Sequence, residues 1–159
     1  MRSTTHNLFS AGLILYVVSY FGYPLLVTVL LMVVATVFTN FLIDKVGHTR
    51  GEGVPRRTWV THSVVTAPLW GAGAWALTII IPAALVGVFP PGLIFLALFS
   101  TLGALTGWSH LFLDSLTEGG VFAPDGKRWA LAHFSYDNRS LNLGLSALGF
   151  TLLFVALFL

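Results

Sequence analysis

The chain is dominated by five apolar runs, and none of them contains Asp, Glu, Lys or Arg. They cover residues 8–21, 25–43, 63–86, 93–113 and 141–159. About 20 apolar residues in an α-helix cross the core of a bilayer. Soluble domains are about 25% charged, whereas only 9% of these 159 residues are charged. We therefore expect an all-α, polytopic membrane protein that forms one domain over residues 1–159, with about five transmembrane helices.

The connections between the runs indicate two helical hairpins and a single last helix. Short turns at residues 22–24 and 87–92 close hairpins over residues 5–44 and 61–114, and the last helix covers residues 141–159. One continuous helix through the first two runs would be about 54 Å long at 1.5 Å per residue. Because this length far exceeds a bilayer, a hairpin is the better interpretation.

The two hairpins return the chain to one face of the membrane, where every Asp, Glu, Lys, Arg and His falls. These residues lie in the N-terminal segment, at neighbouring helix ends, or in polar loops at residues 44–61 and 115–140. The two short turns contain none of them. Since Lys and Arg collect in cytoplasmic loops, we expect a multi-pass protein of the inner, cytoplasmic membrane whose polar face is cytoplasmic.

Charge and cysteine content limit the kind of function. Eight Lys and Arg stand against six Asp and Glu, for a net charge of +2. This is too little for the basic surface that a nucleic-acid-binding protein needs. The chain has no cysteine, so it has neither disulfides nor thiolate ligands. A metal centre would have to be built from imidazole and carboxylate groups.

Two pairs of His and Asp lie at the ends of predicted helices. His110 and Asp114 are four residues apart, as are Asp44 and His48. On a helix, residues with this spacing lie on one face. Ionisable residues at the edge of a membrane span are costly and are candidates for function. Each pair therefore offers an imidazole and a carboxylate that could hold one metal ion.

Two further histidines belong with these pairs. His62 follows Thr61, which can cap the third predicted helix. The segment around His6 resembles the segment around His62, with Thr, His, Ala and Leu recurring in register. This similarity indicates a duplicated two-helix unit, with chance similarity between apolar segments as the alternative. A duplication would place His6 and His62 in related positions.

Together these residues predict a divalent-metal site. Its candidate ligands are Asp44, His48, His62, His110, Asp114 and His6. Carboxylate and imidazole ligands suit zinc, with manganese or iron as alternatives. Three or four ligands with an open position would serve one ion, and five or six could hold two ions, which suits phosphoester hydrolysis. The alternative without metal is a set of His–Asp hydrogen bonds that join helix ends.

Charged residues near these ligands are candidates for phosphate binding and catalysis. Arg50, Arg56 and Arg57 lie in the first polar loop, and a guanidinium can bind phosphate through two hydrogen bonds. We assign Arg50 and Arg57 to the catalytic set, with contact to anionic lipid as the alternative. Glu118 follows the His–Asp pair of the fourth helix and is a candidate general base. The two glycines after Glu118 argue that this helix has already ended.

The motifs resemble those of the membrane-bound metal-dependent hydrolases of the LexA-regulated inner-membrane type and their archaeal relatives. The resemblance covers most of the chain and rests on Thr5-His6, Asp44 with His48, Thr61-His62-Ser63, Ser109-His110 with Asp114, Thr117 and Gly120, and Asn142. In the bacterial members the first acidic motif is a tighter Asp-x-Asp-His, whereas here three residues lie between Asp44 and His48.

The resemblance implies a hydrolase, with a relationship to zinc-dependent phospholipases. The predicted position of the metal ligands, at the depth of lipid headgroups, favours a lipid-borne ester or phosphoester as substrate and membrane lipid as partner. The alternative is a metal-binding or structural membrane protein without turnover. A transporter is a weaker alternative, because no ionisable residue lies in the middle of a predicted span.

Overall fold

The structure is mainly helical, as the apolar runs predict. The computed structural model describes residues 1–21, 25–49, 56–85, 87 and 92–159. The helices are α1 (Ser3–Ser19), α2 (Leu25–Gly47), α3 (Trp59–His62), α4 (Thr66–Leu85), α5 (Leu93–Ser115) and α6 (Arg139–Ala156). Within the described residues, the helical stretches long and apolar enough to cross a membrane are Val29–Gly47, Leu93–Ser115 and Arg139–Ala156. The chain thus has the helices of a membrane protein.

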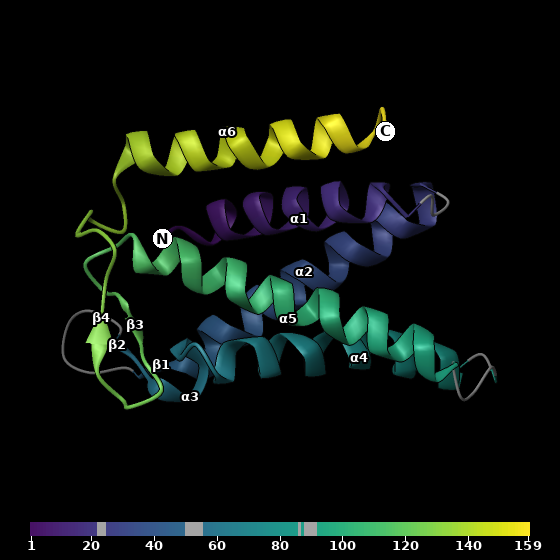
Figure 1. Ribbon diagram of the computed structural model, residues 1–159, viewed down its shortest axis with the longest axis horizontal. Helices are drawn as coiled ribbons and strands as arrows, with labels where there is room; N and C mark the ends of the chain where they lie inside the picture. Colours follow the sequence, from purple (N-terminus) through teal and green to yellow (C-terminus); the bar gives the residue numbers. More distant parts are fainter. Residues whose placement is uncertain (22–24, 50–55, 86, 88–91) are drawn as a thin grey trace.

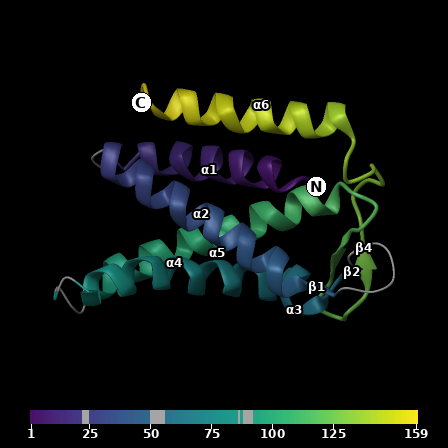
Figure 2. The same cartoon turned by 180° about the vertical axis from the view of Figure 1, so that it is seen from behind.

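The five long helices run back and forth, so the polar segments collect at one end of the molecule (Figure 1). α1 leads away from the N-terminus and α2 returns, then α4 leads away and α5 returns. α6 lies along α1 and ends at the far end. Figure 2 shows from behind that α3 and the short strands lie at the end where the N-terminus is.

The polar loops contain short strands, which the all-α prediction did not include. β1 (His48–Thr49) pairs antiparallel with β2 (Arg56–Arg57), and β3 (Val121–Phe122) pairs antiparallel with β4 (Arg128–Trp129). The prediction that a single third helix starts at residue 63 was also wrong. Ser63 is extended and forms a β-bridge with Phe122, so the short helix α3 is separated from α4.

Glycines allow two pairs of helices to approach closely. A Cβ atom at Gly103 of α5 would overlap the carbonyl oxygen of Gly71 in α4, and the reverse holds at Gly71. The Gly103-x-x-x-Gly107 spacing therefore lies at a close helix contact, as such small-residue spacing predicts. α1 and α6 meet in the same way, because a Cβ atom at Gly12 would overlap the carbonyl oxygen of Gly149.

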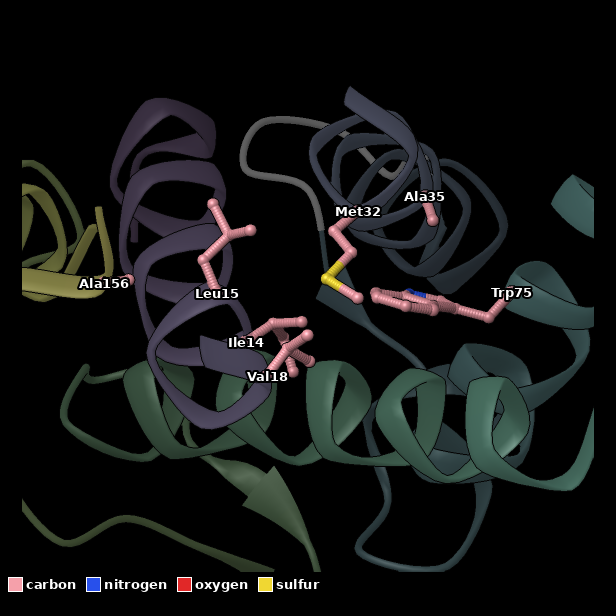
Figure 3. Close-up of a cluster of buried hydrophobic side chains, with 7 residues drawn as sticks. All are labelled: Ile14, Leu15, Val18, Met32, Ala35, Trp75 and Ala156. Carbon is pink, nitrogen blue, oxygen red and sulfur yellow. The ribbon is translucent and has the colours of Figure 1, made fainter. Parts of the chain in front are cut away.

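The main apolar core lies between α1, α2 and α4, away from the polar end. Figure 3 shows the side chain of Met32 from α2 beside the indole of Trp75 from α4, with Ile14 and Val18 of α1 below them. A smaller buried cluster comprises Ile43, Ala67, Leu111 and Val121. This second cluster packs together α2, α4, α5 and β3, at the ends of the helices that carry the predicted metal ligands.

Candidate metal centre

The structure brings all six predicted ligands together, although they come from five elements. They form two groups of three, and within each group the ligand atoms lie within 4.8 Å of one another. The groups are His6, His110 and Asp114, and Asp44, His48 and His62. Each group contains two imidazoles and one carboxylate. His6 is in α1, Asp44 in α2, His48 in β1, His62 in α3, and the remaining two in α5.

The two groups face each other across short distances. His62 Nε2 lies 3.5 Å from Asp114 Oδ2 and 3.8 Å from Asp44 Oδ1. His110 Nε2 lies 3.4 Å from each of these two oxygens. Among the described residues, no hydrogen-bond partner exists for His62 Nε2, His110 Nε2 or Asp114 Oδ2, and all three atoms are buried. Buried polar atoms without partners are costly, so a ligand between them has a clear energetic reason.

These separations suit a metal ion. In a tetrahedral site with bonds of about 2.0–2.1 Å to nitrogen and oxygen, neighbouring ligand atoms lie about 3.3–3.4 Å apart. The four distances between the imidazoles of His62 and His110 and the two carboxylates are 3.4–3.8 Å. The chemistry and spacing of the donor atoms therefore fit zinc, or another divalent ion that accepts nitrogen and oxygen.

Hydrogen bonds from the chain set the tautomers of two of these histidines. His110 Nδ1 lies 3.0 Å from the side-chain oxygen of Asn40, and His48 Nδ1 lies 2.7 Å from the backbone carbonyl oxygen of Asp44. Both oxygens can only accept, so each Nδ1 carries the proton. The lone pair of each ring is then on Nε2. Such a partner on the second nitrogen is the usual arrangement for a metal-binding histidine.

His62 reaches the same state through a neighbouring hydroxyl. Thr61 donates its hydroxyl proton to the backbone carbonyl oxygen of Ile43 at 2.9 Å, so its oxygen accepts from His62 Nδ1 at 2.8 Å. Burial lowers the pKa of His62 from its usual 6.5 to about 4, because the charged imidazolium loses its hydration. His62 is therefore neutral at pH 7, with Nε2 free to bind a metal ion.

His6 lies against His110 and Asp114, the other two members of its ligand group. Its ring stacks on that of His110 with centroids 3.9 Å apart, and its Nε2 lies 3.2 Å from Asp114 Oδ1. The preceding Thr5 donates its hydroxyl proton to the side-chain oxygen of Asn142 at 2.8 Å. Asn142 thus joins α6 to the start of α1, one residue from His6.

The three predicted catalytic residues, Arg50, Arg57 and Glu118, and the neighbouring Arg56 lie in different surroundings. Arg57 is directed into the centre and pairs with Asp114. Arg56, the preceding residue in β2, is exposed. Glu118 is exposed and belongs to neither ligand group. The remaining residue, Arg50, lies outside the described residues.

Residues 1–113 match the model of a family described as a protein of unknown function, DUF1286. The match covers 113 of the 159 residues. The chain belongs to the DUF1286 family. The matched part includes five of the six candidate ligands and ends one residue before Asp114. No curated protein and no solved structure matches the sequence.

Sequence reasoning about this DUF1286 chain missed Asn40 as a partner of the centre and assigned Thr61 only a capping role. Asn40 is four residues before Asp44, so it lies one turn away on the same face of α2. An amide within an otherwise apolar span was the available signal. Thr61 also gave a signal, since it directly precedes a candidate ligand. Its hydrogen bond to Ile43 depends on how α2 and α3 pack and is invisible in the sequence.

Proposed function

We propose that this chain is a metal-dependent hydrolase with five transmembrane helices, which acts on a lipid-borne ester or phosphoester at the cytoplasmic face of the inner membrane. The observation that carries the proposal is the pair of facing ligand groups, each with two histidines and one aspartate. Three protein ligands for each ion leave coordination positions open, as in catalytic rather than structural zinc sites. Two such ions suit the hydrolysis of a phosphoester.

Bound metal would supply an activated water at neutral pH and polarise the ester or phosphoryl oxygen. The residues of the chain do the rest. Asn40, Thr61 and the carbonyl oxygen of Asp44 hold three imidazoles with Nε2 available. Asp44 and His48 are 31% and 27% exposed, whereas the other four ligands are buried. A substrate would therefore reach the centre past Asp44 and His48.

The tryptophans support a substrate that is part of the membrane. Trp59 of α3, Trp108 of α5 and Trp129 of β4 are 42%, 55% and 40% exposed. All three come from the polar end of the molecule, and Trp108 is two residues from His110. Tryptophan is enriched where the bilayer meets water. The proposed centre thus lies at the depth of the lipid headgroups, where an ester or phosphoester linkage is found.

A closed, non-catalytic zinc site is the second candidate. It is favoured by the distances of 3.4–3.8 Å that join the imidazoles of His62 and His110 to the carboxylates of Asp44 and Asp114, because these four groups could bind a single ion. Metal stoichiometry separates the two candidates. Two ions for each chain support the hydrolase with its two ligand groups. One ion, retained through prolonged dialysis and without turnover, supports the closed site.

The test of function uses protein purified in detergent, stripped of metal and reloaded with zinc. We expect metal-dependent release of product from a panel of phospholipids and lipid esters. His62→Ala should abolish turnover while the protein remains folded. The matched control is His133→Ala, because His133 is an exposed histidine outside both ligand groups. Metal-loaded wild-type protein without turnover on the whole panel would contradict the hydrolase proposal.

The proposed topology has a separate test, which the absence of native cysteine makes clean. A cysteine at position 56 in β2 should react with a membrane-impermeant reagent only from the cytoplasmic side. A cysteine at position 92, just before α5, should react only from the other side. Reaction of both from the same side would contradict the hairpin arrangement across the membrane.

A further inference from the structure

The guanidinium of Arg57 makes more contacts than a simple ion pair requires. Its Nη2 donates to Asp114 Oδ1. Its Nη1 donates to the carbonyl oxygen of Gly120 at 2.9 Å, to the hydroxyl of Thr117 at 3.2 Å and to the carbonyl oxygen of Asp114 at 3.4 Å. The side chain is only 10% exposed. Arg57 is thus held between the carboxylate and the backbone that follows it, and these donors are engaged by the protein.

The guanidinium of Arg57 lies against Gly119, where the missing side chain leaves room for it. A Cβ atom at Gly119 would collide with Nη1 of Arg57 and lie 2.9 Å from its Cζ. Gly119 does not have a positive φ, unlike Gly120. Its backbone conformation is therefore open to other residues, and the need for glycine at this position comes from the room that Arg57 occupies.

The two carboxylate oxygens of Asp114 contact different groups. Oδ1 faces Arg57, the amino group of Met1 at 3.2 Å and His6 Nε2. Oδ2 faces the Nε2 atoms of His62 and His110 and has no hydrogen-bond partner among the described residues. A carboxylate held by one oxygen presents the other in a fixed direction, which is how groups behind a metal ligand orient it.

We propose that Arg57, seated by Gly119, is a positioning residue that directs Asp114 Oδ2 into the metal centre. This inference rests on the proposed metal centre. It gives Arg57 a role other than phosphate binding, because Nη1 has three acceptors on the protein and Nη2 has one. The adjacent Arg56 provides an internal comparison, since it lies in the same short strand and has the same chemistry but is exposed to the surroundings.

The test measures the zinc dissociation constant in detergent by competition with a chelating dye. Arg57→Met should weaken zinc binding by about 10- to 100-fold, the usual effect of losing a partner of a metal ligand. Arg57→Lys should recover part of this loss, because it restores a positive charge near Oδ1. Arg56→Met should leave the constant unchanged. Gly119→Ala should weaken binding less than Arg57→Met, since the guanidinium is displaced and not removed.

The double variant gives the sharpest result. If Gly119 acts only by seating Arg57, adding Gly119→Ala to Arg57→Met has no further effect on zinc binding, whereas independent effects would multiply. Unchanged zinc affinity in folded Arg57→Met, or equal losses in Arg57→Met and Arg56→Met, would overturn the inference while leaving the metal centre intact.

Metal-free protein separates failure of the inference from failure of the proposed function. Wild-type protein that binds no zinc would remove the metal centre itself and overturn the inference with it. In chelator, the melting temperatures of Arg57→Met, Asp114→Asn and the double variant then report whether the two side chains are coupled without metal. A non-additive cycle with unchanged zinc affinity would show a purely structural ion pair and would also contradict the positioning role.

Discussion

The two ligand groups have the same composition, but they lie in different surroundings. His6, His110 and Asp114 are all buried. In the other group, only His62 is buried, while Asp44 and His48 are partly exposed. The contrast extends to charge. Asp114 contacts the guanidinium of Arg57, whereas the ion pairs described for Asp44 are all with imidazoles.

The two ligand groups therefore differ in how much they stabilise the fold and in how accessible they are. Breaking the pair of a buried carboxylate and a nearly buried guanidinium is costly with or without metal, because one charge is then left alone in a medium of low polarity. A partly exposed carboxylate among imidazoles contributes little to stability, but molecules from outside the protein can reach it. Under the proposed function, the Asp114 group would anchor the centre and the more exposed Asp44 group would admit metal and substrate.

Loss of the two carboxylates is the strongest test of this difference. In metal-free protein, Asp114→Ala should lower the free energy of unfolding by about 3–5 kcal/mol, because it leaves the guanidinium of Arg57 buried without its partner. Asp44→Ala should cost less than about 1 kcal/mol, as expected for a more exposed charge. Unfolding in detergent with a chelator present measures both. Equal losses would show that the two groups do not differ as described.

The pH dependence of stability tests whether His62 is buried in the folded protein, although it belongs to the more exposed Asp44 group. The pKa of His62 is about 4 in the folded protein against 6.5 for the unfolded chain. Between these values the unfolded state binds a proton that the folded state does not, so stability falls as the pH falls. The full shift corresponds to about 3 kcal/mol.

His62→Gln should therefore lessen the loss of stability of metal-free protein between about pH 6.5 and 4 by roughly that amount. His48→Gln is the matched control, since His48 belongs to the same group but is 27% exposed. Unfolding curves at several pH values in chelator provide the measurement. An equal loss of stability in wild-type protein and His62→Gln would mean that water reaches His62 in solution.

The candidate ligands could be found from sequence because ionisable residues are rare in this chain and fall near the ends of apolar runs. His110 and Asp114 share a face of α5 through their spacing alone. The spacing of Asp44 and His48 predicted proximity too, although α2 ends at Gly47 and His48 begins a strand. A residue just beyond a helix end can still lie over the last turn, and here its ring bonds the carbonyl oxygen of Asp44.

The partners of the ligands could not be found in this way, because they depend on contacts between distant segments. Asn40 meets His110 only because α2 packs against α5. Arg57 faces inward and Arg56 outward because β2 pairs with β1, a strand pairing with too little regular pattern to be predicted. The break after α3 arises from the bridge between Ser63 and Phe122. In each case a local pattern lacks the information that the tertiary contact supplies.

Removing a hydrogen-bond partner should have a smaller effect than removing a ligand. Asn40→Leu keeps the branched shape of the side chain but leaves Nδ1 of His110 without its acceptor, so we expect zinc affinity to fall by about tenfold. Asn7→Leu is the control, because Asn7 contacts the amide of Asn40 and not a histidine. Zinc competition in detergent measures both. A larger effect from Asn7→Leu would indicate that general packing, and not the orientation of His110, is responsible.

The smallest effect on stability and zinc affinity should come from substitution of Glu118, which belongs to neither ligand group. α5 ends at Ser115, and the backbone nitrogen of Glu118 donates to the carbonyl oxygen of Phe134 at 2.9 Å, while its side chain is exposed. A general base has to reach the reacting water directly or through one further water, and the ligand groups do not include this carboxylate.

Glu118→Gln should therefore change stability by less than about 0.5 kcal/mol and leave zinc affinity and any turnover unchanged. A large loss of turnover with unchanged zinc affinity would instead support Glu118 as the general base. It would also show that the loop after α5, and not only the side of Asp44 and His48, reaches the substrate.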